Sequence, residues 1–195
     1  MFLRNRLLSS FPSIVLFAAI LSSDSTTSLA QDSGVNLALH ANSHASAADI
    51  GLPAYPGATL YKNPDSDAAV DLGFTFGDVH FKLMAANYMT SDSPAQVLAF
   101  YRKPLSHYGE VLECNHGKPV GGLGVARGGL TCSDPQANHM RVNGSADSSD
   151  DHEMRSGTPN EFRIVGIDES HTGSTHFGLV YLELPKGSVS DGKSK

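Results

Sequence analysis

The sequence predicts an α+β protein, a two-layer sandwich in which a mainly antiparallel sheet of about five to six strands packs against one main helix. Three observations favour this fold class. Apolar and polar residues alternate along several short segments, which is the period of half-buried strands. One segment carries apolar residues at helical spacing. Two cysteines, Cys114 and Cys132, are available to close the fold with a disulfide.

The N-terminal residues have the layout of a signal peptide. Arg4 and Arg6 precede an uncharged apolar run at residues 14–21, and small residues follow at 28–30. A retained membrane anchor is the alternative, but crossing a bilayer takes about 20 apolar residues, and this run is far shorter. The sequence therefore predicts that residues 1–30 are cleaved, that the protein is secreted or periplasmic, and that it has no stable membrane insertion afterwards.

The charge balance argues against nucleic acid as a partner. Without residues 1–30, which contain Arg4, Arg6 and Asp24, the 14 basic and 20 acidic residues of the chain become 12 and 19, a net charge of −7. A chain this acidic is repelled by phosphate backbones and anionic membrane surfaces. The remaining 165 residues are enough for one domain with its own core.

Composition divides the rest of the chain into three parts. Residues 31–50, rich in Ala, Ser, Asn and Asp, read as a disordered linker. Residues 51–186 are predicted to form the single domain, with a flexible acidic loop around 133–156. Residues 187–195 are predicted to be a disordered tail, because they offer almost nothing to bury.

The first strands are predicted from strict alternation. Residues 70–76 and 79–86 each alternate apolar and polar positions, and Gly77-Asp78 between them favours a hairpin turn. Upstream, Pro56-Gly57 is typical of a type II turn, and we expect Tyr55 beside it to pack on the core.

The main helix is predicted from residue 94 onward. Ser93 is a good N-cap, Pro94 suits the first helical position, and Gly109 supplies a stop. Pro104 removes one hydrogen bond and crowds the carbonyl of Phe100, so we expect a kink or break between these two residues. The helical face is formed by apolar residues at the expected spacing: Val97, Phe100, Tyr101, Leu105 and Tyr108.

Four further strands are expected at residues 110–114, 130–132, 162–167 and 175–184. The glycine-rich segment between the first two of these is the loop that the disulfide would tether. In an oxidising compartment a Cys114–Cys132 bridge persists, and closing a loop of this length contributes about 3 kcal/mol in the chain-entropy model. A redox or metal-binding cysteine pair is the alternative, although the spacing is far from C-x-x-C.

The glycine-rich loop offers the first candidate binding residues. Residues 121–129 resemble a phosphate-binding turn, but no helix is expected after them and Arg127 stands where a dinucleotide fingerprint needs glycine. A glycine loop carrying Lys118 and Arg127 could still cover a small anionic ligand.

The acidic loop offers a candidate metal set, and no other cofactor is expected. Imidazole and thioether ligands suit copper, and imidazole and carboxylate suit zinc. A solvated loop that binds no metal is the alternative, because wrapping an ion costs a mobile loop its entropy. The candidate ligands are His139, Met140, Asp150, His152 and Met154.

A hydrolase with a histidine base is a third possibility. The sequence contains no G-x-S-x-G motif. Ser174 lies two residues from His176, which places both on one face of a strand, but a triad also needs an orienting carboxylate. Asp168 or Glu169 could supply it only through the tertiary fold. His80 is the other candidate base, and it could approach His176 across the sheet; no catalytic residue is assigned.

Three segments resemble a pattern that recurs in exported bacterial proteins of unknown function. They are LPAYPGA at 52–58, SPAQVLAFYRKPLSHYG at 93–109 and VLEC at 111–114. In these proteins a Tyr-Pro-Gly-Ala turn precedes a strand pair and a helix with an F-Y-R signature. The resemblance implies export and similar domain boundaries, and it implies no activity, substrate or cofactor. This chain departs from the pattern at Pro104.

The leading functional hypothesis is a non-enzymatic binding or interaction module of the cell envelope, because no convergent set of polar residues is evident on the predicted elements. Its partner would be another envelope protein or a small anionic ligand, contacted through an exposed sheet face or edge. A copper- or zinc-binding protein and a hydrolase remain the alternatives.

Overall fold

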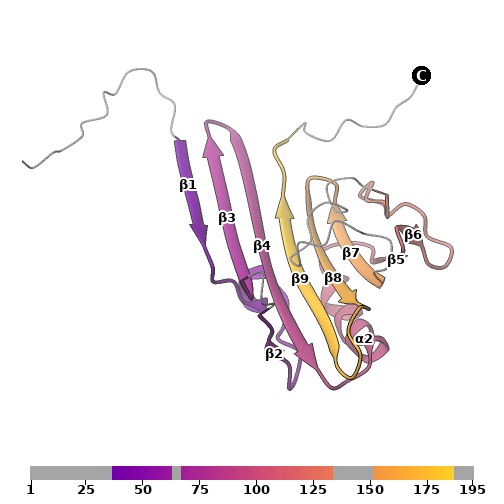
Figure 1. The fold of residues 1–195 in the computed structure, drawn as a ribbon. Helices are drawn as coiled ribbons and strands as arrows, with labels where there is room; N and C mark the ends of the chain where they lie inside the picture. The colour runs from indigo at the N-terminus through magenta and orange to yellow at the C-terminus, as the bar shows by residue number, and fades with distance from the viewer. Residues whose placement is uncertain (1–36, 63–66, 134–151, 187–195) are drawn as a thin grey trace, which may run out of the picture. The chain divides into compact units, whose positions relative to one another are not determined.

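The computed structural model describes residues 37–62, 67–133 and 152–186, which form one sheet of nine strands and two helices. The strand order is β1-β3-β4-β9-β8-β7-β5-β6, with β2 also paired to β4, and all pairs are antiparallel (Figure 1). The predicted mainly antiparallel sheet is therefore confirmed. The sheet is larger than the predicted five to six strands. The two-layer sandwich is not confirmed, because helices cover one face of the sheet and a loop covers part of the other.

In chain order the strands are β1 (Leu37–Asn42), β2 (Thr59–Leu60), β3 (Ala69–Phe76), β4 (Val79–Thr90), β5 (Leu112–Asn115), β6 (Lys118–Pro119), β7 (His152–Thr158), β8 (Glu161–Asp168) and β9 (Thr175–Glu183). The helices are α1 (Ala47–Ile50) and α2 (Pro94–Leu105). The expected hairpin is formed by β3 and β4, with Gly77 at φ 57° in its turn, a conformation that glycine adopts without strain.

The larger core lies between the helices and one face of the sheet. Val97, Tyr101 and Leu105 of α2 are fully buried against residues of β4, β7, β8 and β9. Tyr55 packs in the same core, where its ring meets Phe100 edge-on at 5.0 Å, as expected from the sequence. Neither helix of the described ranges has the length and apolar content needed to cross a bilayer.

The predicted break in the main helix does not occur. α2 runs unbroken through Phe100 and Pro104 and ends at Leu105, with Ser106 as its C-cap, well before Gly109. Pro104 lies in the last turn, so hardly any helix follows that a kink could displace. A capping box at the other end satisfies two backbone N–H groups, since Ser93 and Gln96 bond each other's backbone.

Residues 37–50, expected as part of the linker, instead form β1 and α1. α1 is held by a capping box between Ser46 and Asp49, and Ile50 is buried in the larger core. β1 pairs with β3 over its whole length. Residues 31–36 lie outside the described residues, as does the predicted tail at 187–195.

The predicted acidic loop around 133–156 is shorter than expected at its C-terminal side. Residues 152–156 belong to β7, which pairs with β5 and β8. The strand was missed because its sequence is polar, yet Met154 and Arg155 are fully buried. Residues 134–151 lie outside the described ranges.

A second core lies on the opposite face of the sheet. Side chains of β8 and β9, among them Phe162, Ile164 and Leu182, pack there against Ala126 and Leu130 of the glycine-rich loop. The strand expected at 130–132 is absent; a single bridge joins Val125 to Thr131. This loop therefore acts as the cover that a second helix layer would otherwise provide.

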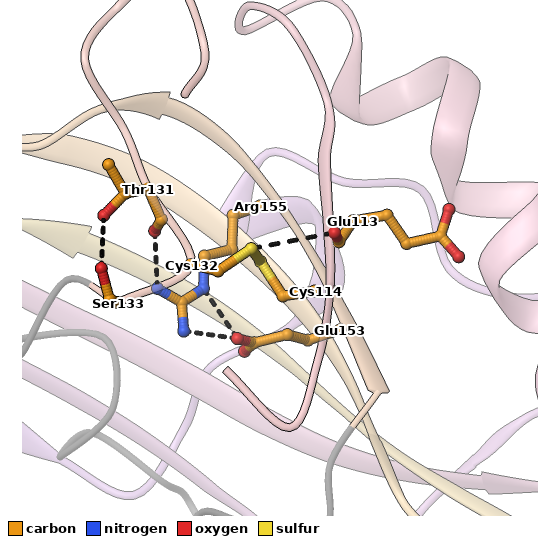
Figure 2. Close-up of polar contacts among 7 residues, drawn as sticks. All are labelled: Glu113, Cys114, Thr131, Cys132, Ser133, Glu153 and Arg155. Atoms are coloured by element: carbon orange, nitrogen blue, oxygen red, sulfur yellow. Dashed lines mark hydrogen bonds and ion pairs between the residues drawn. A yellow bond between two sulfur atoms is a disulfide. The ribbon is translucent and has the colours of Figure 1, made fainter. Parts of the chain in front are cut away.

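The predicted disulfide anchors this loop to the sheet. Cys114 of β5 and Cys132 are bonded, with their Cα atoms 5.6 Å apart. Beside them Arg155 donates from Nε to Glu153 Oε1 over 2.8 Å and from Nη1 to the Thr131 carbonyl over 3.1 Å. Figure 2 shows the guanidinium beside the disulfide, between the Thr131 carbonyl and the Glu153 carboxylate. A covalent bond and a buried ion pair thus hold the same short segment.

Replacing Arg155 by methionine is expected to lower the free energy of unfolding by about 3–5 kcal/mol, the range for breaking a buried ion pair. Arg155 is 1% exposed, and its loss leaves the mostly buried Glu153 charge without this partner. Arg127→Met is the matched control: that side chain is 91% exposed in its pair with Glu110, so its loss should cost less than about 1 kcal/mol. Urea unfolding at pH 7 measures both, and equal losses would contradict the assignment.

Candidate functional site

The turn between β8 and β9 brings together several side chains that can donate or accept a proton or a hydrogen bond. Ser174 precedes β9 and His176 is its second residue. The Ser174 Oγ and the His176 Nε2 lie 2.9 Å apart, within hydrogen-bonding distance. His176 is 6% exposed and its Nδ1 is buried without a hydrogen-bond partner. The imidazole thus presents one nitrogen to a serine and none to a carboxylate.

Two aromatic rings fix the orientation of His176. The His171 ring stacks on it with centroids 3.8 Å apart and planes 11° from parallel. Tyr61, which follows β2, meets it edge-on at 4.1 Å. Tyr61 reaches this position because its backbone N–H donates to the Asn87 carbonyl and continues the β2–β4 pairing. The imidazole is therefore held from two sides.

Asp168 is the cross-strand neighbour of His176, but it binds other groups of the turn. Its Oδ1 accepts hydrogen bonds from the backbone N–H of Ser170 at 2.9 Å and from the Ser170 hydroxyl at 2.5 Å. Its Oδ2 lies 3.2 Å from His171 Nδ1. A triad would require a carboxylate beside His176 Nδ1. The Asp168 carboxylate lies at the end of β8, but it is oriented toward His171 and not toward that nitrogen.

These surroundings favour the charged form of Asp168 and the neutral form of His176. Burial disfavours the charged form of Asp168, but hydrogen bonds from Ser170 outweigh it and lower the pKa of that carboxyl below its ordinary value. Burial, followed by the neighbouring His171, lowers the pKa of His176, which the negative charge of Asp168 only partly offsets. At pH 7 the site therefore combines an ionised aspartate with a neutral His176.

A cleft of about 510 Å³ lies in front of this turn. It is lined by residues from the β8–β9 turn, including Ser174, and by residues from the end of β4 to the first turn of α2. Asp92, Asp168 and Glu169 give it three carboxylates. A cleft of this size accommodates a small ligand, and its lining favours an uncharged or cationic one.

A second candidate surface lies at the other end of β4. Six side chains lie on one face there, because they occupy directly opposite positions of β1, β3 and β4. Leu37 and Leu39 are 65% and 79% exposed, and no described element covers them. We call this set the apolar face: Leu37, Leu39, Phe74, Phe76, Val79 and Phe81.

The candidate residues of the glycine loop have ordinary structural contacts. Arg127 Nε lies 3.0 Å from Glu110 Oε1, and the Arg127 backbone N–H donates to the same carboxylate. Lys118 is exposed on β6, at the edge of the sheet. The loop itself packs on the second core through Ala126 and Leu130.

The candidate metal set falls partly outside the described residues, because His139, Met140 and Asp150 lie there. Of the others, Met154 is fully buried in the larger core, and His152 Nε2 lies 2.8 Å from Glu113 Oε1. Within the ranges that the structure describes, no three His, Cys, Asp or Glu side chains are grouped so that they could hold a metal ion.

The two candidate bases do not approach each other. His80 pairs with Thr75 near the hairpin turn, whereas His176 pairs with Met89 near the other end of β4. Nine residues of extended strand separate these positions, about 30 Å. His80 is exposed, with Nδ1 3.4 Å from Thr75 Oγ1.

The sequence indicated the Ser174–His176 spacing but not the residues around it. Tyr61 and His171 were missed, since neither belongs to a recognisable motif and their approach depends on how β2 and the β8–β9 turn are placed. Comparison of the chain with models of protein families, with curated proteins and with solved structures finds no match in any of the three.

Acidification is expected to destabilise the protein partly through His176. Because the folded-state pKa of His176 is below the ordinary value of 6.5, the unfolded chain binds more protons in this range. Its contribution to stability is full above pH 6.5 and is lost as the pH falls through the lower, folded-state pKa. His176→Gln should therefore flatten the decline in unfolding free energy between pH 7 and 5, above the range in which Asp168 titrates.

His107→Gln is the matched control, because His107 is exposed on the segment after α2. The control should keep the wild-type pH dependence in urea unfolding. Identical curves for wild type and His176→Gln, or an NMR-measured pKa of His176 above 6.5, would refute the prediction.

Proposed function

We propose that this protein is a binding module of the cell envelope that engages an extended, apolar segment of another protein along β1. The observation that carries the proposal is the apolar face, which ends on an exposed edge strand. Monomeric proteins seldom leave an apolar surface of this kind exposed unless it contacts something. An added strand would bury Leu37 and Leu39 and pair with the β1 backbone.

The composition of β1 supports a strand-like partner. Its sequence, LALHAN, contains no Lys, Arg, Asp, Glu or Pro, which are the residues that natural edge strands use to prevent pairing. Five of its six residues are exposed. An uncharged, regular edge next to an apolar face fits an uncharged segment with alternating apolar side chains.

The chemistry of the chain supports a location outside the cytoplasm. The Cys114–Cys132 disulfide is of a kind that persists in oxidising compartments. The predicted signal peptide lies outside the described residues and stays a prediction. An envelope protein with an open edge at β1 suits a role in contacting another envelope protein.

The proposal is tested by selecting partners from a displayed library of random ten-residue peptides, without assuming an identity. Selected peptides should carry apolar residues at alternating positions. The Leu37→Ser/Leu39→Ser variant should bind them at least about tenfold more weakly, because each leucine loses part of about 1.5–3 kcal/mol of burial and 1.4 kcal/mol is tenfold in affinity. Titration calorimetry measures the difference.

Ala38→Ser/His40→Gln is the matched control, since these residues occupy the same strand but its opposite face. It should bind with wild-type affinity. Peptides without alternation, equal loss in both variants, or binding unaffected by either would contradict the proposal. So would a concentration-dependent dimer through β1 in sedimentation, since the edge would then be used by a second copy.

A further inference from the structure

The Ser174–His176 pair lies far from β1. Along the shared strands, the apolar face adjoins the Lys82–Glu183 position, whereas the pair adjoins the Thr90–Thr175 position. Eight residues of strand separate these two positions, about 26 Å. Figure 1 shows the two ends of β4 and β9 well apart. Chemistry at the pair would therefore be independent of binding along β1.

We propose that Ser174 and His176 form a nucleophile and general base that hydrolyse small carboxylic esters in the adjacent cleft. Ser174 lines the cleft, and its Oγ lies 2.9 Å from His176 Nε2, within the distance that proton transfer from an attacking hydroxyl requires. His176 itself is 6% exposed and is not among the residues that line the cleft, so the base is shielded from solvent while Ser174 borders the cleft.

The reaction would proceed in two balanced steps. The Ser174 Oγ attacks the ester carbonyl and its proton passes to His176 Nε2; the bond to the alcohol then breaks, and Nε2 returns the proton to the departing oxygen. Water next attacks the acyl-serine, giving a proton to Nε2, and Ser174 leaves with that proton. The net change is ester plus water to acid plus alcohol.

Several features of the cleft define the substrate. Asp92, Asp168 and Glu169 line it, so anionic esters are disfavoured and uncharged or cationic ones fit. Its volume of about 510 Å³ restricts the acyl and alcohol groups to small ones. The first turn of α2 also lines the cleft, and the positive end of the helix dipole favours a developing oxyanion near it.

The geometry also sets the expected rate. His176 Nδ1 has no partner, whereas in a full triad a carboxylate holds that nitrogen. Losing the orienting carboxylate costs about 10⁴-fold in a serine protease, so a slow hydrolase is expected. Lowered basicity of His176 has a benefit: the imidazole is neutral, and therefore able to accept a proton, throughout the range above pH 6.5.

The test uses the full exported chain, a fluorophosphonate probe and p-nitrophenyl acetate. The wild type should take up one phosphonyl group, mapped by mass spectrometry to Ser174, and should hydrolyse the ester faster than buffer. Ser174→Ala should abolish the label and reduce hydrolysis at least tenfold, to the buffer rate. His176→Gln, which keeps a polar side chain of similar size, should slow labelling at least tenfold.

Thr172→Ala is the matched control, because Thr172 carries an exposed hydroxyl on the same turn and is not among the residues that line the cleft. It should label and turn over like the wild type. Absence of label in a folded wild-type protein, label on another residue, or equal labelling of wild type and His176→Gln would overturn the proposal. In that case the Ser174 hydroxyl would only form a hydrogen bond with the buried His176 imidazole. None of these outcomes depends on whether β1 binds a peptide.

Discussion

The length of β4 is the constraint on which the rest of the structure depends. Its twelve residues extend about 40 Å, whereas the twelve residues of α2 extend about 18 Å and the four of α1 about 6 Å. Two short helices therefore cover only part of one face of a nine-stranded sheet. Each unusual feature of the protein is a consequence of how the remaining surface is covered or left open.

The part of the sheet that the helices do not cover falls into three regions. On the face opposite the helices, the glycine-rich loop lies over β8 and β9, and the disulfide and Arg155 hold it there. At the hairpin end of β4 no described element covers Leu37 and Leu39 of the apolar face, which we propose as the binding surface. At the other end, the passage from β4 into α2 leaves the cleft beside Ser174. The proposed binding surface and the proposed catalytic pair thus lie toward opposite ends of one strand.

The sequence was informative wherever apolar residues follow a regular period. Strands β8 and β9 and the helix after Ser93 could be predicted, because their apolar residues are the ones that are buried. The β3–β4 hairpin could be predicted from its alternation, although Phe74 is only half-buried and Phe76 is exposed, and the disulfide could be predicted from the two cysteines. The sequence failed for β1, whose leucines are exposed, and for β7, whose buried arginine makes the strand look polar. The site was visible only as the Ser174–His176 spacing, since Tyr61 and His171 join it through tertiary contacts.

Native-state hydrogen exchange along β4 tests the central claim that the sheet extends beyond its cover. Amides of residues 84–90, which lie over the larger core, should exchange only with global unfolding. Those of residues 79–82 should exchange through local opening, with a protection free energy several kcal/mol lower, as expected for strands that bury little apolar surface. Uniform protection along the whole strand would show that the hairpin end is as well packed as the centre and would contradict the account.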